Sequence, residues 1–228
     1  MPQKTNLNIS PYYDDFDKAD NFYKVLFKPG FPVQARELSN LQSILQNQVE
    51  QFGQHFFKDG SKVIPGNTSY SQNYYAVQLS NTFQGVPVAA YADQLVGTKI
   101  TGQTSGVTAT VSQILQAQDS ENGNITLYIN YVASSTANNS SQTFDDAENL
   151  VCDTTLTTGL LSGNAIAIGS PFASTIASNA TAIGSAFHVE DGVYFVRGQF
   201  VNVSAETLIL DQYSNTPTYR VGFNVLEE

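Results

Sequence analysis

The stretch that decides the fold lies at residues 33–58 and reads VQARELSNLQSILQNQVEQFGQHFFK. Its apolar residues recur at spacings of three and four, which is the period of one face of an α-helix, and Ile44 widens that face. Glutamines occupy the other faces. The spacing therefore predicts an amphipathic helix over 33–58, with an apolar stripe made of Leu38, Leu41, Leu45, Val49, Phe52 and Phe56.

Two uses of this stripe are compatible with the sequence. The helix can pack on a β-sheet of its own chain, or it can join an interchain bundle around a symmetry axis. In heptad register four stripe residues take a or d positions, but Gln48 and His55 take such positions too. The stripe is thus expected to serve as core or as an imperfect oligomer seam.

Upstream of the helix, residues 1–32 read as an extended arm, because four prolines interrupt regular structure there. The arm is rich in Phe and Tyr, whose exposure to water is unfavourable. We expect it to bury these side chains against its own body or against another subunit. The predicted partner-docking residues are Tyr12, Tyr13, Phe16, Phe22 and Phe27.

Downstream of the helix the sequence favours β structure. Asp59-Gly60 and Asp191-Gly192 are typical of hairpin turns. Residues 57–66 and 189–198 share a weak pattern, which suggests two hairpin units paired in one sheet; chance similarity is the alternative. The predicted fold class is mainly β with one long N-terminal amphipathic helix (α+β). Its parts are an extended arm (1–32), the helix (33–58), a β body (59–84 plus 186–228) and an inserted small β domain (85–185).

Composition narrows the classes of function. The formal net charge is −10, and residues 63–196 hold nine acidic residues against one basic residue, Lys99. Without a Lys and Arg cluster, we expect no nucleic-acid partner. Only 13% of residues are charged, against roughly 25% in an average globular protein, and neutral polar surfaces of this kind suit permanent assemblies.

The sequence also indicates whether the chain has disulfides and where it is made. The single cysteine, Cys152, excludes an internal disulfide. The N-terminus lacks the apolar run of a signal peptide, and no stretch approaches the ~18 apolar residues of a membrane span. These features predict no membrane association and synthesis in a cytoplasm.

Catalytic motifs are missing from the sequence. His55 and His188 have no partner at a fixed spacing, and no hydrolase, metalloprotease or nucleotide-binding motif occurs. The spacing of the acidic clusters favours helix capping, ion pairing and turns over calcium binding. A glycosidase would need two carboxylates about 5–9 Å apart in a cleft, and sequence alone leaves that distance open. We predict no enzyme, no cofactor and no metal. The clusters are Asp14, Asp15, Asp17 and Asp20; Asp119 and Glu121; and Asp145, Asp146 and Glu148.

Several stretches resemble a pattern found in structural proteins of tailed phages. They are PYYDDF (11–16), FKPGFPVQAREL (27–38), FKDG (57–60), GVYFVRG (192–198) and YSNTPTYRVG (213–222). The family they resemble is an uncharacterised virion-protein family of mostly contractile-tailed, cyanophage-like viruses. The resemblance implies association with the baseplate or tail fibre, and it carries over no catalytic residues.

Together these features predict a structural tail protein, either a baseplate protein or a tail-fibre adaptor or anchor. It would be made in the host cytoplasm, assemble as a homotrimer and contact other tail or baseplate proteins. The alternative is a receptor-binding module that recognises a host glycan or surface protein through residues 85–185. A glycan-degrading enzyme is a third hypothesis.

Overall fold

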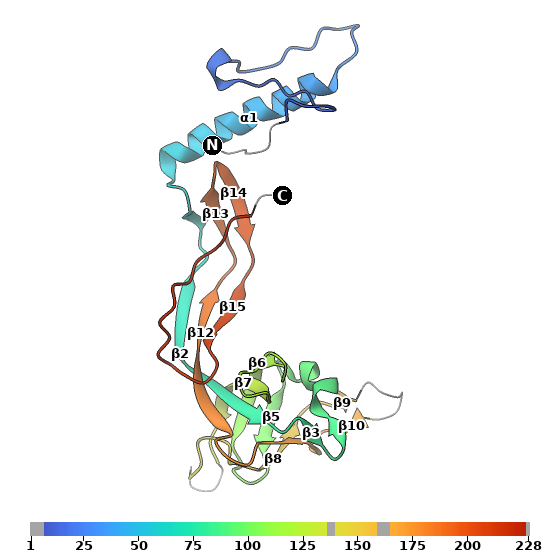
Figure 1. Cartoon of the computed structure of the whole chain (residues 1–228), viewed down its shortest axis with the longest axis vertical. Helices are drawn as coiled ribbons and strands as arrows, with labels where there is room; N and C mark the ends of the chain where they lie inside the picture. The colour runs from blue at the N-terminus through green and yellow to red at the C-terminus, as the bar shows by residue number, and fades with distance from the viewer. Residues whose placement is uncertain (1–6, 136–139, 159–164, 227–228) are drawn as a thin grey trace. The chain divides into compact units, whose positions relative to one another are not determined.

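The computed structural model describes residues 7–135, 140–158 and 165–226 (Figure 1). The start of the predicted arm (1–6) and two pieces of the predicted insertion (136–139 and 159–164) lie outside the described residues. The described part is mainly β and contains one α-helix, α1 (Ala35–Phe56), which confirms a mostly β fold class. No helix in this part is long and apolar enough to cross a membrane.

The chain forms two compact units. Unit 1 comprises Met1–Ser69 and Val189–Glu206, and unit 2 comprises Tyr70–His188 and Thr207–Glu228. This division differs from the predicted one, in which residues 85–185 form a domain inserted into a β body. The observed boundaries fall at 69/70, 188/189 and 206/207 instead.

Unit 1 contains a three-stranded antiparallel sheet in the order β1-β13-β14. Its strands are β1 (Ser61–Ile64), β13 (Gly192–Val196) and β14 (Gln199–Val203). Ser61 pairs with Phe195, and the Gly60 amide donates to the Phe195 carbonyl at 2.7 Å. The two segments of the suggested repeat, 57–66 and 189–198, therefore lie in one sheet.

The helix α1 contacts this sheet close to the helix C-terminus. Gly53 lies so close to the Phe195 ring that a Cβ added to the glycine would sit 2.7 Å from Phe195 Cζ. The rings of Phe57 and Phe200 extend the contact, with centroids 5.9 and 5.3 Å from that of Phe195. A glycine at position 53 is therefore what lets the helix backbone approach the sheet.

Unit 2 is built on an eight-stranded sheet in the order β11-β8-β5-β6-β7-β2-β12-β15. The β2–β7 pairing joins Tyr75 to Ile129 and Leu79 to Ile125. The strands are β2 (Thr68–Leu79), β5 (Lys99–Gly102), β6 (Thr108–Leu115), β7 (Ile125–Ala133), β8 (Asn149–Cys152), β11 (Pro171–Ser174), β12 (Thr181–Val189) and β15 (Glu206–Asp211).

Shorter elements complete the two units. Two-stranded pairings join β3 (Thr82–Phe83) to β4 (Val86–Pro87) and β9 (Leu156–Thr157) to β10 (Ala165–Ile166). Three 3-10 helices are described: η1 (Lys18–Asp20), η2 (Val88–Ala90) and η3 (Ala92–Leu95).

The core of unit 2 explains why residues 85–185 are not a separate domain. Strand β2 supplies Val77 and Leu79 to the same buried cluster as Ile100, Leu127 and Phe172 from the predicted insertion. Ala76, Val77, Gln78 and Leu79 are all buried, so both faces of this end of β2 are covered. A strand at the centre of a sheet cannot belong to a different domain from its hydrogen-bonded neighbours.

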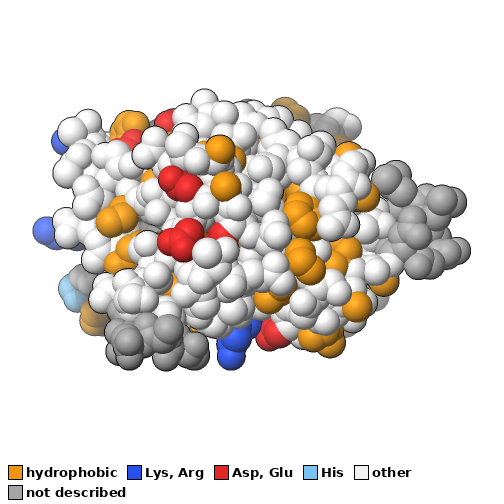
Figure 2. Space-filling model, turned by 90° about the horizontal axis from the view of Figure 1, so that it is seen from below, with side chains coloured by type: hydrophobic (Ala, Val, Ile, Leu, Met, Phe, Trp, Pro, Cys, Tyr) orange, Lys and Arg blue, Asp and Glu red, His pale blue; other side chains and the backbone are white. Residues whose placement is uncertain are grey.

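The last described residues, 212–226, form no helix or strand, but their first part is anchored in unit 2. The Tyr213 hydroxyl lies 2.7 Å from Ser120 Oγ and 2.9 Å from Thr126 Oγ1. Gln212 donates to the Asp119 carbonyl and accepts from the Glu121 amide. Neutral polar side chains thus satisfy one another around Gln212 and Tyr213. Figure 2 shows the molecule from below, where charged side chains are few.

Candidate functional site

Unit 1 leaves an unusual number of large apolar side chains in contact with solvent. They come from the arm and from α1, and each of them is between 43% and 78% exposed. Exposed apolar side chains, where they gather into a patch, mark sites of protein interaction. We call this set the apolar surface of unit 1: Tyr12, Tyr13, Phe22, Tyr23, Leu26, Phe27 and Phe31 from the arm, and Leu38, Leu45, Val49, Phe52 and Phe56 from α1.

The stripe predicted on the helix belongs almost entirely to this surface. Five of its six residues are 47–63% exposed, and Leu41 is half-buried. The residues that α1 buries are Ile44, Glu50 and Gly53 instead. The helix contacts the sheet of its own chain through Gly53, and five of the six stripe residues stay exposed. The first predicted use, in which the stripe packs on that sheet, is therefore not observed.

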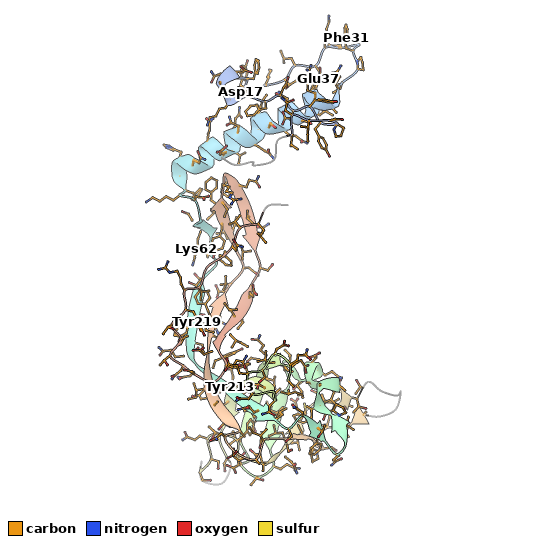
Figure 3. The ribbon with its side chains drawn as sticks, in the orientation of Figure 1. Asp17, Phe31, Glu37, Lys62, Tyr213 and Tyr219 are labelled. Atoms are coloured by element: carbon orange, nitrogen blue, oxygen red, sulfur yellow. The ribbon has the colours of Figure 1, made fainter. Side chains whose placement is uncertain are left out.

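The predicted docking residues of the arm are also accessible. Tyr12, Tyr13, Phe22 and Phe27 are exposed, whereas Phe16 is half-buried. Figure 3 shows Phe31 at the outer bend of the arm, away from Asp17. Apart from Phe16, the predicted docking residues of the arm are thus not buried against its own body.

Carboxylates attach the arm to the helix. Ser43 donates a short hydrogen bond to Asp14, and Asn40 donates to Asp15 at 3.0 Å. Arg36 lies 3.8 Å from Asp15, which is the kind of pairing expected for this cluster. Asp17 accepts from the Ala19 amide at 2.8 Å and caps η1, so capping also occurs.

A groove of about 1060 Å³ lies where the arm, α1 and the β13–β14 turn meet. Its walls include Asp14 to Lys18 of the arm, Leu45, Val49 and Glu50 of the helix, and Phe200 of β14. The groove therefore combines an apolar floor with carboxylates.

Two of the three acidic residues at 145–148, Asp146 and Glu148, accept hydrogen bonds from backbone amides. Glu148 is buried and accepts four hydrogen bonds, from the amides of Thr104, Ser105 and Asp145 and from the Ser105 hydroxyl. Asp146 accepts from the amides of Asn179 and Ala180. Among the described residues, no three His, Cys, Asp or Glu side chains gather as metal ligands do.

The resolved pKa shifts concern tyrosines, most of them in the core of unit 2. Burial raises the pKa of Tyr91 to about 12, and its hydroxyl donates to the Phe172 carbonyl. Burial also raises the pKa of Tyr131 to about 12. These shifts come from desolvation, which favours the neutral phenol, and they indicate a dry core rather than a reactive site.

Sequence reasoning missed part of the exposed apolar surface. Phe200 and Val201 of β14 are 41% and 42% exposed, although they lie in a strand. Two adjacent apolar residues in a strand point to opposite faces, so one of them must be poorly covered in a sheet with a single packed face. The signal was present in the sequence, but it needed the strand assignment to be recognised.

No curated protein and no solved structure matches this chain. Residues 10–143 match the family described as a domain of unknown function (DUF4815). The match includes most of the arm, all of α1 and the strands up to β7, which is more than half of the chain. The chain therefore belongs to the DUF4815 family.

Proposed function

We propose that this protein is a structural component of a bacteriophage tail, a baseplate protein or tail-fibre adaptor that acts through protein–protein interfaces. The observation that carries the proposal is the exposed apolar surface of unit 1. The resemblance of both chain ends to tail proteins supplies the setting.

The composition of that surface supports an interface rather than a catalytic site. Aromatic residues are enriched at the centres of protein interfaces, where they bury a large area at little conformational cost. The N-terminal helix is amphipathic, and its apolar stripe lies on the accessible side. In water this arrangement is unfavourable, so a partner that covers the stripe and the arm stabilises the protein.

The charge of the two units favours self-association through unit 1. Unit 1 carries ten acidic and eight basic residues, whereas unit 2 carries ten acidic and two basic residues. Copies of a nearly neutral unit approach one another with little repulsion. We therefore propose a homotrimer in which unit 1 forms the subunit contacts and part of the docking arm contacts another tail protein.

Light scattering after size exclusion tests the assembly, and mass spectrometry of purified virions tests the location. We expect a mass near three times 24.7 kDa and a defined copy number in the particle. Deletion of residues 1–30 should prevent incorporation into tails while unit 2 stays folded. A protein that is absent from virions, or a deletion that assembles normally, would contradict the proposal.

A further inference from the structure

Residues 22–31 are the most accessible part of the arm and form no helix or strand. Phe22, Tyr23, Leu26 and Phe31 are each more than 60% exposed. Lys24 and Lys28 are interspersed with them, and residues 21–36 contain no acidic residue at all. The segment is therefore a cationic, aromatic peptide that stands in solvent.

The groove described above has the opposite character. Its walls contain the carboxylates of Asp14, Asp15, Asp17 and Glu50 and the ammonium group of Lys18, and Arg36 lies 3.8 Å from Asp15, so the acidic groups still outnumber the basic ones. Glu50 on α1 is buried, and its carboxylate accepts a hydrogen bond from the side-chain amide of Gln54 at 2.8 Å. Within the described residues no Lys or Arg pairs with Glu50, so a buried carboxylate is stabilised there by an amide alone. Such a group favours a cationic occupant.

The size of the groove fits several side chains. Its volume of about 1060 Å³ lies just above the roughly 300–1,000 Å³ of small-molecule pockets. Its floor includes Leu45, Val49 and Phe200, which offer an apolar contact for aromatic rings. Size, apolar floor and negative charge all match the exposed segment.

The segment does not occupy its own groove in this structure, since none of its residues lines the groove. It is held at both ends, by the Asp17 cap of η1 on one side and by the Gln34–Glu37 hydrogen bond that starts α1 on the other. A chain that carries a surface and its complement at different places associates head to tail, and such contacts close into rings when the rotation allows it.

We propose that residues 22–31 of one copy bind in the acidic groove of unit 1 of the next copy. The inference rests on the proposed function and refines it: this segment joins copies to each other, which leaves Tyr12 and Tyr13 for a different tail protein. The four aromatic side chains of the segment, Phe22, Tyr23, Phe27 and Phe31, are exposed to about 60% on average and bring roughly 350–600 Å² to the contact. A standard interface buries about 800 Å² per partner, and the helix stripe supplies the remainder.

Disulfide cross-linking in the full chain tests this contact. A Leu26→Cys chain is mixed with a Gln46→Cys chain, because Gln46 is exposed and lines the groove, while native Cys152 is buried. Mild oxidation should give a cross-linked species of twice 24.7 kDa that contains one copy of each variant. Leu26→Cys mixed with Lys99→Cys, on the surface of unit 2, is the matched control and should give no such species.

Each other outcome overturns the inference in a recognisable way. If the mixture does not cross-link but light scattering still reports an oligomer, the contact is wrong and the proposed assembly stands. If a Leu26→Cys/Gln46→Cys chain forms its disulfide within one chain, the segment binds its own groove.

Charge reversal gives a second, independent readout. Lys24→Glu/Lys28→Glu should weaken self-association by about tenfold or more, and the effect should shrink in high salt. Lys99→Glu/Arg220→Glu changes the net charge equally in unit 2 and should leave the oligomer intact. Equal weakening by both pairs would show that overall charge, not the groove, governs assembly.

Discussion

Replacement of Glu148 by glutamine tests whether the acidic residues at 145–148 are structural. The buried carboxylate uses one oxygen to accept from the amides of Thr104 and Ser105, at 3.2 and 3.0 Å. The other oxygen accepts from the Asp145 amide at 2.7 Å and from the Ser105 hydroxyl at 2.9 Å. Glu148 therefore ties the β5–β6 turn to the start of β8.

The cost of Glu148→Gln can be worked out from these four hydrogen bonds. A glutamine keeps one oxygen, and its amide nitrogen must then face at least one backbone N–H that it cannot accept from. An unsatisfied buried donor costs about 1–3 kcal/mol. The remaining bonds lose their charge assistance, which makes such bonds roughly twice as strong as neutral ones. We expect a loss of about 2–4 kcal/mol in the free energy of unfolding.

Thermal unfolding followed by circular dichroism is the assay. For a chain of this size each kcal/mol lowers Tm by about 2–4 °C, so a decrease of roughly 5–15 °C is expected. Glu121→Gln makes the same chemical change at an exposed position in unit 2 and should lower Tm by less than about 2 °C. Equal Tm values for the two variants would refute a structural role of Glu148 and reopen the glycosidase hypothesis.

Three further predictions concern the helix and the core. Gly53→Ala should destabilise the chain by about 0.5–2 kcal/mol in urea, because crowding of the Phe195 ring outweighs the gain in helix propensity; a more stable variant would contradict the close approach. Leu45→Ala with Phe52→Ala should change the unfolding of the monomer by less than about 1 kcal/mol per site, since both side chains are more than half exposed, yet should lower the oligomer mass measured by light scattering. The free energy of unfolding should fall between pH 10 and pH 12, because unfolded tyrosines lose their proton near pH 10 whereas burial raises the pKa of Tyr91 to about 12. Tyr91→Phe should reduce this alkaline loss of Tm. An unchanged dependence of Tm on pH would remove Tyr91 as its cause.

Local patterns in the sequence were informative where the physics is local. The periodic stretch 33–58 contains α1, which spans Ala35–Phe56, because helical spacing depends on neighbours three and four residues away. The dipeptides at 59–60 and 191–192 lie at breaks between elements, but neither closes a hairpin: the first lies between α1 and β1, and the second between β12 and the start of β13, which belong to different sheets. Such signals need no knowledge of distant partners.

Long-range pairing was not accessible in this way. Strand β2 pairs with β7 about fifty residues later, and no turn signal specifies that partner. The predicted boundary at 84/85 therefore cut through one sheet. Glu148 shows the same limit at a candidate site, since its acceptor role depends on Thr104 and Ser105, more than forty residues away. Periodicity likewise identified the helix stripe but not whether the chain itself covers it.

The large exposed aromatic and aliphatic side chains of the arm and α1 belong to unit 1, and this is why we propose the interface role for that unit. In unit 2, β2 lies inside an eight-stranded sheet with a large buried apolar cluster, and Gln212 and Tyr213 bond to neighbouring polar groups. Unit 2 also exposes some apolar side chains of its strands, among them Val132 and Leu208. Unit 1 has a three-stranded sheet that meets α1 through Gly53, so it offers little surface to cover a helix and an aromatic arm. The uncovered stripe is then a consequence of a sheet too small for its helix. We propose that another chain completes this core, and the nearly neutral charge of unit 1 makes a second copy of this chain the partner of least electrostatic cost.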